Sequence, residues 1–178
     1  MTGQEFLKQL DGYFRKGEME AAQDFLQKTY AEAVGEGDVS LQLTVLNEMM
    51  SYAGGTDQEE FGIAAVTECT RLIQEYGLQD NPSAGTMWMN MGITLYRFDR
   101  VEDALACYRV AEEQLLKQYE KLDALPDSTE KGQALGDVVR ELASFYSKVA
   151  SAYAKKKDYK GAEQYYKKAE QLIVLQDY

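Results

Sequence analysis

The sequence predicts an all-α protein with about eight helices. Apolar residues recur at intervals of three and four along nearly the whole chain, which is the spacing of one helix face. Only 2 of the 178 residues are proline, the residue least tolerated inside a helix. No segment alternates apolar and polar residues as a strand does. With 45% apolar and 28% charged residues, the chain is expected to form a single repeat domain over residues 1–178.

The first two expected helices are marked by local start and stop signals. Thr2 with Glu5 forms a capping box, in which the hydroxyl and the carboxylate satisfy amides at a helix start. Gly17 ends that helix, because glycine takes the left-handed conformation without penalty. The second helix is expected over about residues 18–33, before the loop at 35–38.

The third and fourth helices follow the same logic. Asp38 is expected to cap a helix that runs to about residue 53. The glycine pair at 54–55 is expected to form the next turn. Thr56 with Glu59 predicts a second capping box, at the start of a fourth helix that ends near Gly77.

The second half of the chain is expected to hold four more helices. Pro82 suits the first turn of the fifth, where a missing N–H has no consequence. Asp99 with Glu102 marks the start of the sixth, which runs towards Tyr119. The segment LPDST at 125–129 predicts a break.

A long seventh helix is expected over about residues 130–156, and Asp158 is expected to cap an eighth that ends near Leu175. The seventh keeps a single apolar stripe throughout its length. The stripe comprises Leu135, Val139, Leu142, Tyr146, Val149 and Tyr153.

The chain is internally repetitive. Four windows of 24 residues align without gaps, at 6–29, 46–69, 88–111 and 146–169. Each begins with a large apolar residue and has a turn in its middle. The second half of each window has a small residue and, four residues on, a larger one. The small residues are Ala22, Gly62, Ala104 and Ala162, and the larger ones are Leu26, Val66, Tyr108 and Tyr166. Residues 121–143 form an insertion before the last window.

This pattern resembles the tetratricopeptide repeat (TPR) family, with its Trp-x2-Leu-Gly-x2-Tyr motif followed by Ala-x3-Phe. The third window carries the motif at Trp88, Met91, Gly92, Leu95, Ala104 and Tyr108, and the last window at Tyr146, Val149, Ala150, Tyr153, Ala162 and Tyr166. The windows begin 40, 42 and 58 residues apart, not the usual ~34. The resemblance is therefore to a long-helix variant with about four repeats, and it implies a right-handed superhelical α-solenoid of antiparallel helix pairs.

The resemblance implies that the first helix of each pair lines a concave groove that binds peptides or protein segments. It places Phe14 and Arg15 on the groove side of the first window. The other implied groove residues are Asn47, Ser51, Asn90, Ile93, Tyr96, Arg97, Lys148, Ser151 and Lys155. The chemistry suits an extended peptide, because an asparagine both donates and accepts hydrogen bonds and Arg97 and Lys148 can hold carboxylates. The alternative for each residue is a solvated position on an exposed helix face.

Charge narrows the range of partners. The net charge is -11, which repels phosphate backbones, so nucleic acid is not an expected partner. Residues 1–89 carry 5 basic and 15 acidic side chains, and residues 90–178 carry 14 and 15. The lysines at 155–157, with Lys160, Lys167 and Lys168, form a basic run that either binds an acidic tail or is a solvated turn.

Catalysis, metals, cofactors and membranes are not expected. The chain has no histidine, which excludes every histidine-based triad and metal site. Cys69 and Cys107 are expected to pack as small apolar residues. Ser128 and Lys131 match the S-x-x-K pattern of an acyl enzyme, but its companion motifs are missing. No apolar run reaches the length of a membrane span, and no secretory signal is expected, so the predicted location is the cytoplasm.

The expected function is therefore a non-enzymatic scaffold or adaptor that binds a peptide or helix of a partner protein. One alternative is a regulator that responds to a signalling peptide. Another is a self-associating module, a homodimer formed through the C-terminal helix. Its interface residues would be Tyr165, Leu172, Ile173, Val174 and Leu175.

Overall fold

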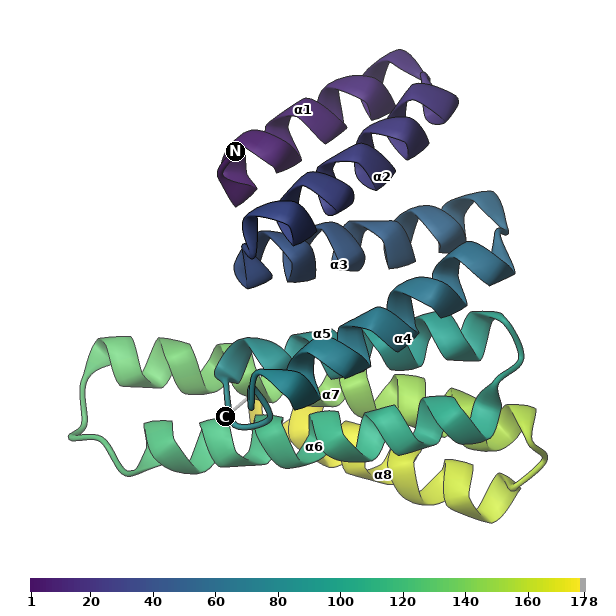
Figure 1. Ribbon diagram of the computed structural model, residues 1–178. Helices are drawn as coiled ribbons and strands as arrows, with labels where there is room; N and C mark the ends of the chain where they lie inside the picture. The colour runs from purple at the N-terminus through teal and green to yellow at the C-terminus, as the bar shows by residue number, and fades with distance from the viewer. Residues whose placement is uncertain (177–178) are drawn as a thin grey trace. The chain divides into compact units, whose positions relative to one another are not determined.

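A computed structural model describes residues 1–176, apart from the side chains of residues 82, 83, 175 and 176. The described residues form eight α-helices and no strand, which confirms the all-α prediction (Figure 1). The helices are α1 (Gly3–Lys16), α2 (Met19–Glu36), α3 (Val39–Thr56), α4 (Glu59–Glu75), α5 (Pro82–Arg97), α6 (Val101–Asp123), α7 (Thr129–Lys155) and α8 (Tyr159–Gln176).

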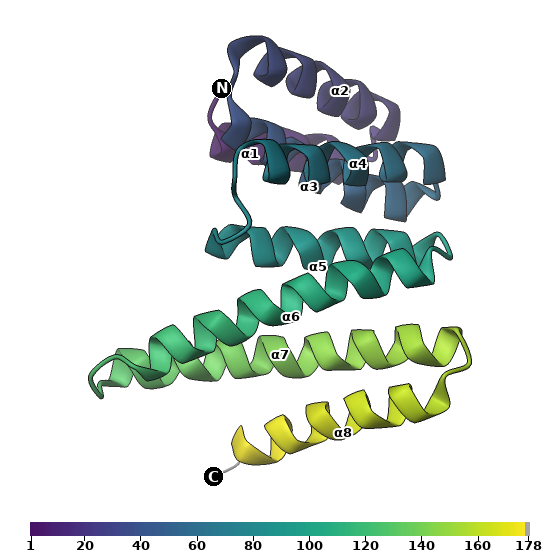
Figure 2. The same cartoon turned by 60° about the horizontal axis from the view of Figure 1, so that its bottom comes forward.

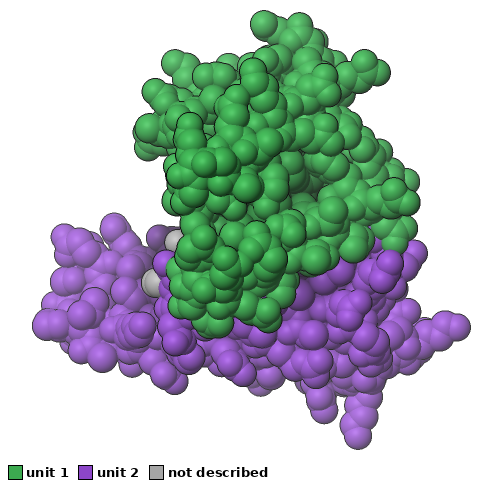
Figure 3. All heavy atoms as spheres, viewed as in Figure 1, with its two compact units in different colours: residues 1–79 green, residues 80–178 purple. Residues whose placement is uncertain are grey.

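The chain divides into two compact units (Figure 3). Unit 1 is Met1–Gln79 and holds α1 to α4, and unit 2 is Asp80–Tyr178 and holds α5 to α8. Inside each unit, helices that follow one another in sequence pack against one another. Each unit is described by itself below, and the single repeat domain over 1–178 stays a prediction.

The helix ends of unit 1 confirm most of the expected signals. Thr2 N donates to Glu5 Oε2 at 2.8 Å and Glu5 N donates to Thr2 Oγ1 at 3.2 Å, which completes the capping box. Gly17 ends α1 with a φ of 72°, in the left-handed region that favours glycine. Asp38 Oδ1 accepts from Leu41 N at 3.0 Å and caps α3.

The turn between α3 and α4 differs from the prediction. The glycine pair at 54–55 lies inside the last turn of α3, which continues to Thr56 and ends at Asp57 with a φ of 58°. Thr56 forms no capping box, because its hydroxyl donates to the carbonyl oxygen of Tyr52 at 2.8 Å. Gln58 is the N-cap of α4, and its side chain makes no capping hydrogen bond.

Unit 2 shows a similar shift at the start of α6. Pro82 is the first residue of α5 and Asp158 caps α8 through Gly161 N at 2.9 Å, both as expected. Asp99, however, is not the cap of α6, because it takes the left-handed conformation and Arg100 holds the N-cap position. The Asp99 carboxylate instead pairs with Lys155 Nζ at 2.5 Å.

The 121–143 insertion lengthens two helices. It extends α6 to Asp123 and supplies the first half of α7, so that these two helices form a long antiparallel pair (Figure 2). Lys131 closes the turn between them, because its Nζ donates to the carbonyl oxygens of Asp123 at 2.7 Å and Leu125 at 2.8 Å. Ser128 Oγ caps α7 by accepting from Lys131 N at 3.0 Å. The Ser128–Lys131 motif therefore has a structural role in closing this turn.

Small residues allow close helix packing, as the repeat pattern predicts. Ala22, Ala104 and Ala162 are buried. A Cβ placed on Gly92 would lie 2.5 Å from the Tyr108 ring, which only glycine avoids. Tyr166 departs from the pattern, because it is exposed although it aligns with buried residues in the other windows.

Candidate protein-interaction surface

Most of the predicted groove residues lie in unit 2, on α5 and α7, the first helix of each of its two helix pairs. Asn90, Ile93 and Arg97 follow one another on α5 at intervals of three and four, and Tyr96 lies beside Arg97. Lys148, Ser151 and Lys155 follow one another in the same way on α7. Such spacing places each set on a single side of its helix. Arg97 and Lys155 are exposed and the other five are half-buried, so each set belongs to a partly open surface.

The structure joins the two sets at one end, between Tyr96 and Lys155. Lys155 Nζ lies 4.4 Å from the centre of the Tyr96 ring and donates to the Tyr96 carbonyl oxygen at 3.0 Å. The same Nζ pairs with Asp99, as described above. Lys155 thus links the ends of α5 and α7, and its charge is already balanced by a carboxylate of the same unit.

Two cations on this surface have no carboxylate partner among the described residues. Lys148 Nζ donates to the neighbouring Ser144 Oγ at 2.8 Å. Arg97 forms no ion pair within the part of the chain that the structure describes. Ser151 Oγ donates to the Ser147 carbonyl oxygen at 3.0 Å, which leaves its lone pairs as acceptors. The surface therefore offers unpaired positive charge beside the apolar side chain of Ile93.

The remaining predicted residues form a separate set in unit 1. Asn47 and Ser51 lie one turn apart on α3, where Asn47 Nδ2 donates to Glu48 Oε1 at 3.2 Å and Ser51 is exposed. On α1, the Phe14 ring stacks on Tyr52 with centres 6.4 Å apart, and Arg15 pairs with Asp11 at 2.7 Å. Phe14 is thus held by packing against α3.

Sequence reasoning missed the hydrogen-bond network around Tyr52. The Tyr52 hydroxyl lies 3.1 Å from both the Met19 carbonyl oxygen and Gln23 Oε1. Gln23 and Gln58 exchange amide hydrogen bonds of 3.1 and 3.2 Å. These partners are about 30 residues apart in sequence, so no local spacing could reveal the network. It fixes the start of α2 against α3 and the N-cap of α4.

The basic run at the end of α7 and on α8 is largely neutralised inside unit 2. Lys156 pairs with Glu102 at 2.7 Å, and this hydrogen bond raises the pKa of Lys156. Lys168 lies 3.5 Å from Glu112 and 4.5 Å from the centre of the Tyr165 ring. These contacts tie α7 and α8 to α6, so much of the run serves the packing of unit 2.

The two cysteines are poor nucleophiles. Both are buried, and burial raises the pKa of Cys69 to about 12 and that of Cys107 to about 11. The thiolate is the reactive form of cysteine, so both thiols are almost wholly unreactive at neutral pH. Their burial confirms the expectation that they pack as small apolar residues.

The described residues hold no candidate metal centre, and the hollow described on unit 2 is too small for a ligand. A hollow lined by Arg109, Glu112, Tyr153 and Tyr165 has no room for a small-molecule ligand. Among the described residues, no group of three or more cysteine, aspartate or glutamate side chains could hold a metal ion. None of the described helices combines the length and apolar character that crossing a membrane requires.

Comparison with known proteins supports the fold. No protein-family model and no curated protein matches the sequence. Among solved structures, the chain is similar to BtubC (BKLC) from P. vanneervenii, with a TM-score of 0.58 and 13% identity over 98% of this chain and 80% of that one. It is also similar to kinesin light chain TPR-like repeats from Podosopora anserina, with a TM-score of 0.54 and 12% identity over 97% of this chain and 95% of that one.

Proposed function

The chain has a TPR-like helical repeat fold, and we propose that it acts as a non-enzymatic scaffold that binds a partner protein. The partner contributes a peptide or a helix, which lies along the exposed side of α5 and α7. We place this activity in the cytoplasm, as the sequence suggests, and we expect no nucleic-acid partner because of the acidic net charge.

The observation that carries the proposal is the pair of cationic side chains on this side of unit 2 that have no carboxylate partner among the described residues. These are Arg97 and Lys148, and the half-buried Ile93 lies one turn before Arg97 on α5 as an apolar contact. Unpaired cations beside apolar surface favour a segment that brings both carboxylates and apolar side chains. Asn47 and Ser51 on α3 offer a smaller set of polar contacts in unit 1.

The proposal is tested by comparing partner capture by the wild type and by the Asn90→Ala, Arg97→Ala, Lys148→Ala triple variant. Proteins captured from a lysate are identified by mass spectrometry and then mapped to a binding segment with synthetic peptides. We expect the mapped peptide to bind the triple variant at least tenfold more weakly, measured by isothermal titration calorimetry, because two charge-assisted contacts are lost.

A matched variant on α6 controls for the change of composition. Arg109→Ala, Gln118→Ala and Lys121→Ala remove the same kinds of side chain from exposed positions outside the predicted groove. This control should bind the peptide like the wild type. Equal binding by all three proteins would show that the α5–α7 side is not the binding surface, and circular dichroism checks that each variant is folded.

The regulator that responds to a peptide is the alternative for the same surface. It requires that the peptide change the structure as well as bind. Hydrogen exchange of α5 and α7 with and without the mapped peptide separates the two functions. Protection confined to the contact residues fits a scaffold, and protection that spreads through unit 2 fits the regulator.

A further inference from the structure

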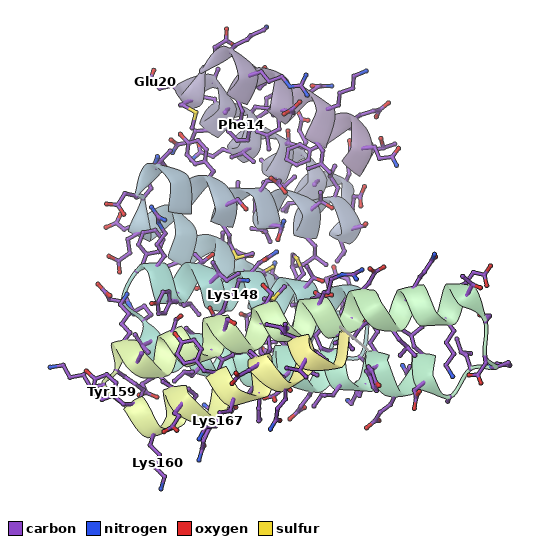
Figure 4. The ribbon with its side chains drawn as sticks, turned by 180° about the vertical axis from the view of Figure 1, so that it is seen from behind. Phe14, Glu20, Lys148, Tyr159, Lys160 and Lys167 are labelled. Carbon is purple, nitrogen blue, oxygen red and sulfur yellow. The ribbon has the colours of Figure 1, made fainter. Side chains whose placement is uncertain are left out.

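The outer side of α8 carries an apolar row that nothing covers in the described residues. Tyr159, Tyr166 and Ile173 are spaced by seven residues, which places them on one side of the helix. Their exposed fractions are 68%, 49% and 53%, and that of the adjacent Val174 is 52%. Figure 4 shows Tyr159, Lys160 and Lys167 on the outer side of α8.

Two residues of this row, Tyr166 and Ile173, align with buried residues in the other repeats. The residues that align with Tyr166 in the first three windows are buried, and so are those that align with Ile173 when each window is extended by four residues. They are Leu26, Val66 and Tyr108 at the first position, and Ala33, Ile73 and Leu115 at the second. The cover is visible on α6, where the Tyr108 ring meets Phe145 of α7 with centres 5.7 Å apart. The row on α8 therefore has the character of a surface that another helix covers.

The N-terminal helix of a second copy does not suit this surface. α3 and α7, which pack on α2 and α6, each have two large apolar residues at positions where α1 has Glu5 and Gln9, both exposed, and α5 has the same apolar pattern in sequence. The apolar pairs are Val45 with Met49, Met87 with Met91, and Phe145 with Val149. A polar α1 would leave the apolar row of α8 in contact with charged groups, so head-to-tail stacking of copies is disfavoured.

The charges beside the row suit a second copy of α8 itself. Lys160, Glu163, Lys167 and Glu170 alternate in sign along the outer side of the helix, where Lys167 also pairs with Glu163 of the same helix at 2.7 Å. In an antiparallel copy that places residue 165 opposite residue 165, residue 160 faces residue 170 and residue 163 faces residue 167. Each lysine then lies opposite a glutamate. The contact would carry four such pairs, because a two-fold axis repeats each one. A parallel copy in register would set like charges against each other.

From the uncovered row and the self-complementary charges, we propose that the outer side of α8 forms a homodimer interface with α8 of a second copy, the two helices running antiparallel. Tyr166 lies near the two-fold axis, and Tyr159 of one copy lies close to Ile173 and Val174 of the other. This surface is separate from the α5–α7 side, so the dimer does not depend on the proposed scaffold function.

The interface differs from the one suggested by sequence alone. Tyr165 lies on the inner side of α8, because its ring stacks on Tyr153 with centres 5.3 Å apart. Leu172 is half-buried, and the side chain of Leu175 lies outside the described residues. Ile173 and Val174 remain in the interface, and Tyr159 and Tyr166 join them.

Sedimentation velocity on the whole chain tests the dimer directly. A contact between two single helices lies at the small end of specific interfaces, so we expect a dimer that forms at micromolar concentration. The expected mass rises with concentration from 20.1 kDa to twice that value and no further. A chain that stays monomeric at about 100 µM would overturn the proposal, and so would growth beyond the dimer, because a two-fold contact is closed.

Charge reversal tests the antiparallel arrangement. K160E/K167E makes the side wholly acidic and E163K/E170K makes it wholly basic, so each variant alone should dimerise at least tenfold more weakly than the wild type. An equimolar mixture of the two should restore a dimer. The fourfold variant carrying all these changes reverses every sign, keeps the alternation and should dimerise like the wild type.

The control variant K8E/K121E lowers the net charge by the same amount as K160E/K167E, at exposed positions on α1 and α6. It should dimerise like the wild type. A wild-type affinity in K160E/K167E, or a fourfold variant as weak as the two double variants, would contradict the antiparallel α8 interface. Circular dichroism confirms that each variant is folded, which the exposure of all four positions leads us to expect.

Discussion

Units 1 and 2 are built from the same kind of helix pair but are held together differently. Unit 1 carries 5 basic and 14 acidic side chains, whereas unit 2 carries 14 and 16. Ion pairs in unit 1 lie within single helices, such as Lys28 with Glu32 on α2. In unit 2, Lys156 and Lys168 reach carboxylates on a different helix.

Aromatic packing shows the same contrast. In unit 2 an almost continuous set of rings ties α6, α7 and α8, from Tyr108 through Phe145 and Tyr146 to Tyr165. Burial raises the pKa of Tyr108 and that of Tyr146, and it raises the pKa of Tyr165 to about 12. Unit 1 instead has two separate sets of three rings, one around Phe25 and one around Tyr52, beside aliphatic and methionine side chains. A shared repeat pattern thus accommodates two different ways of stabilising a stack of helices.

The largest expected effect is a core truncation in either unit. Phe145 and Phe6 are both fully buried, so Phe145→Ala should destabilise unit 2, and Phe6→Ala unit 1, by about 3–5 kcal/mol each. Each unit contains one buried cysteine, Cys69 or Cys107, which reacts with a thiol reagent only after local opening. Phe145→Ala should therefore accelerate labelling of Cys107, and Phe6→Ala should accelerate labelling of Cys69.

The pair of truncations also tests whether the units unfold independently. Mass spectrometry of the labelled peptides separates the two rates in one sample. If Phe145→Ala accelerated both cysteines equally, the two units would unfold as one cooperative body. The fluorescence of Trp88, the single tryptophan of the chain, gives a second reading of unit 2 against the circular dichroism of the whole chain.

A smaller effect is expected from closing the gap at Gly92. A Cβ there meets the Tyr108 ring and lies 3.2 Å from the Ala104 carbonyl oxygen. Gly92→Ala should therefore destabilise unit 2 by about 1–3 kcal/mol, in spite of the better helix propensity of alanine. Urea denaturation followed by Trp88 fluorescence measures the change.

Gly12 in α1 supplies the matched control for Gly92. It has nothing within 4 Å of an added Cβ, so Gly12→Ala should stabilise unit 1 by up to about 1 kcal/mol. A stabilising Gly92→Ala would mean that Tyr108 moves aside freely, and the close approach of α5 and α6 would not depend on glycine.

The smallest expected effect concerns ion pairs that join different helices. Lys168→Met keeps the apolar stem but removes the contacts with Glu112 and with the Tyr165 ring. It should cost unit 2 about 1 kcal/mol at low salt, and less in about 1 M NaCl. Lys28→Met removes a pair within α2 at 3.9 Å and should cost no more than about 0.5 kcal/mol. Equal costs in urea denaturation would remove this distinction between the units.

Several features could be predicted because they depend on residues close in sequence. The capping of α1, α3 and α8 follows from contacts over three residues, as with Asp38 and Leu41 N. The predicted caps at Thr56 and Asp99 were wrong. The Thr56 hydroxyl bonds to the Tyr52 carbonyl oxygen, and the Asp99 carboxylate pairs with Lys155, so neither side chain caps a helix. Local signals therefore place a helix end well until a distant residue competes for the same atoms.

The sequence alone determined that this protein is all-α and repetitive. Helix periodicity and the spacing of small and large residues depend only on residues within a single window. Only the tertiary structure decided which of these side chains are exposed and which are held by contacts within the chain. Lys155, predicted to lie in the groove, donates to the carbonyl oxygen of Tyr96, 59 residues away, and its role in binding stays a prediction. Tyr166 aligns with buried residues but is exposed. Both outcomes depend on which other helix packs against the residue. Local sequence patterns do not contain that information, because the packing partner is distant in sequence.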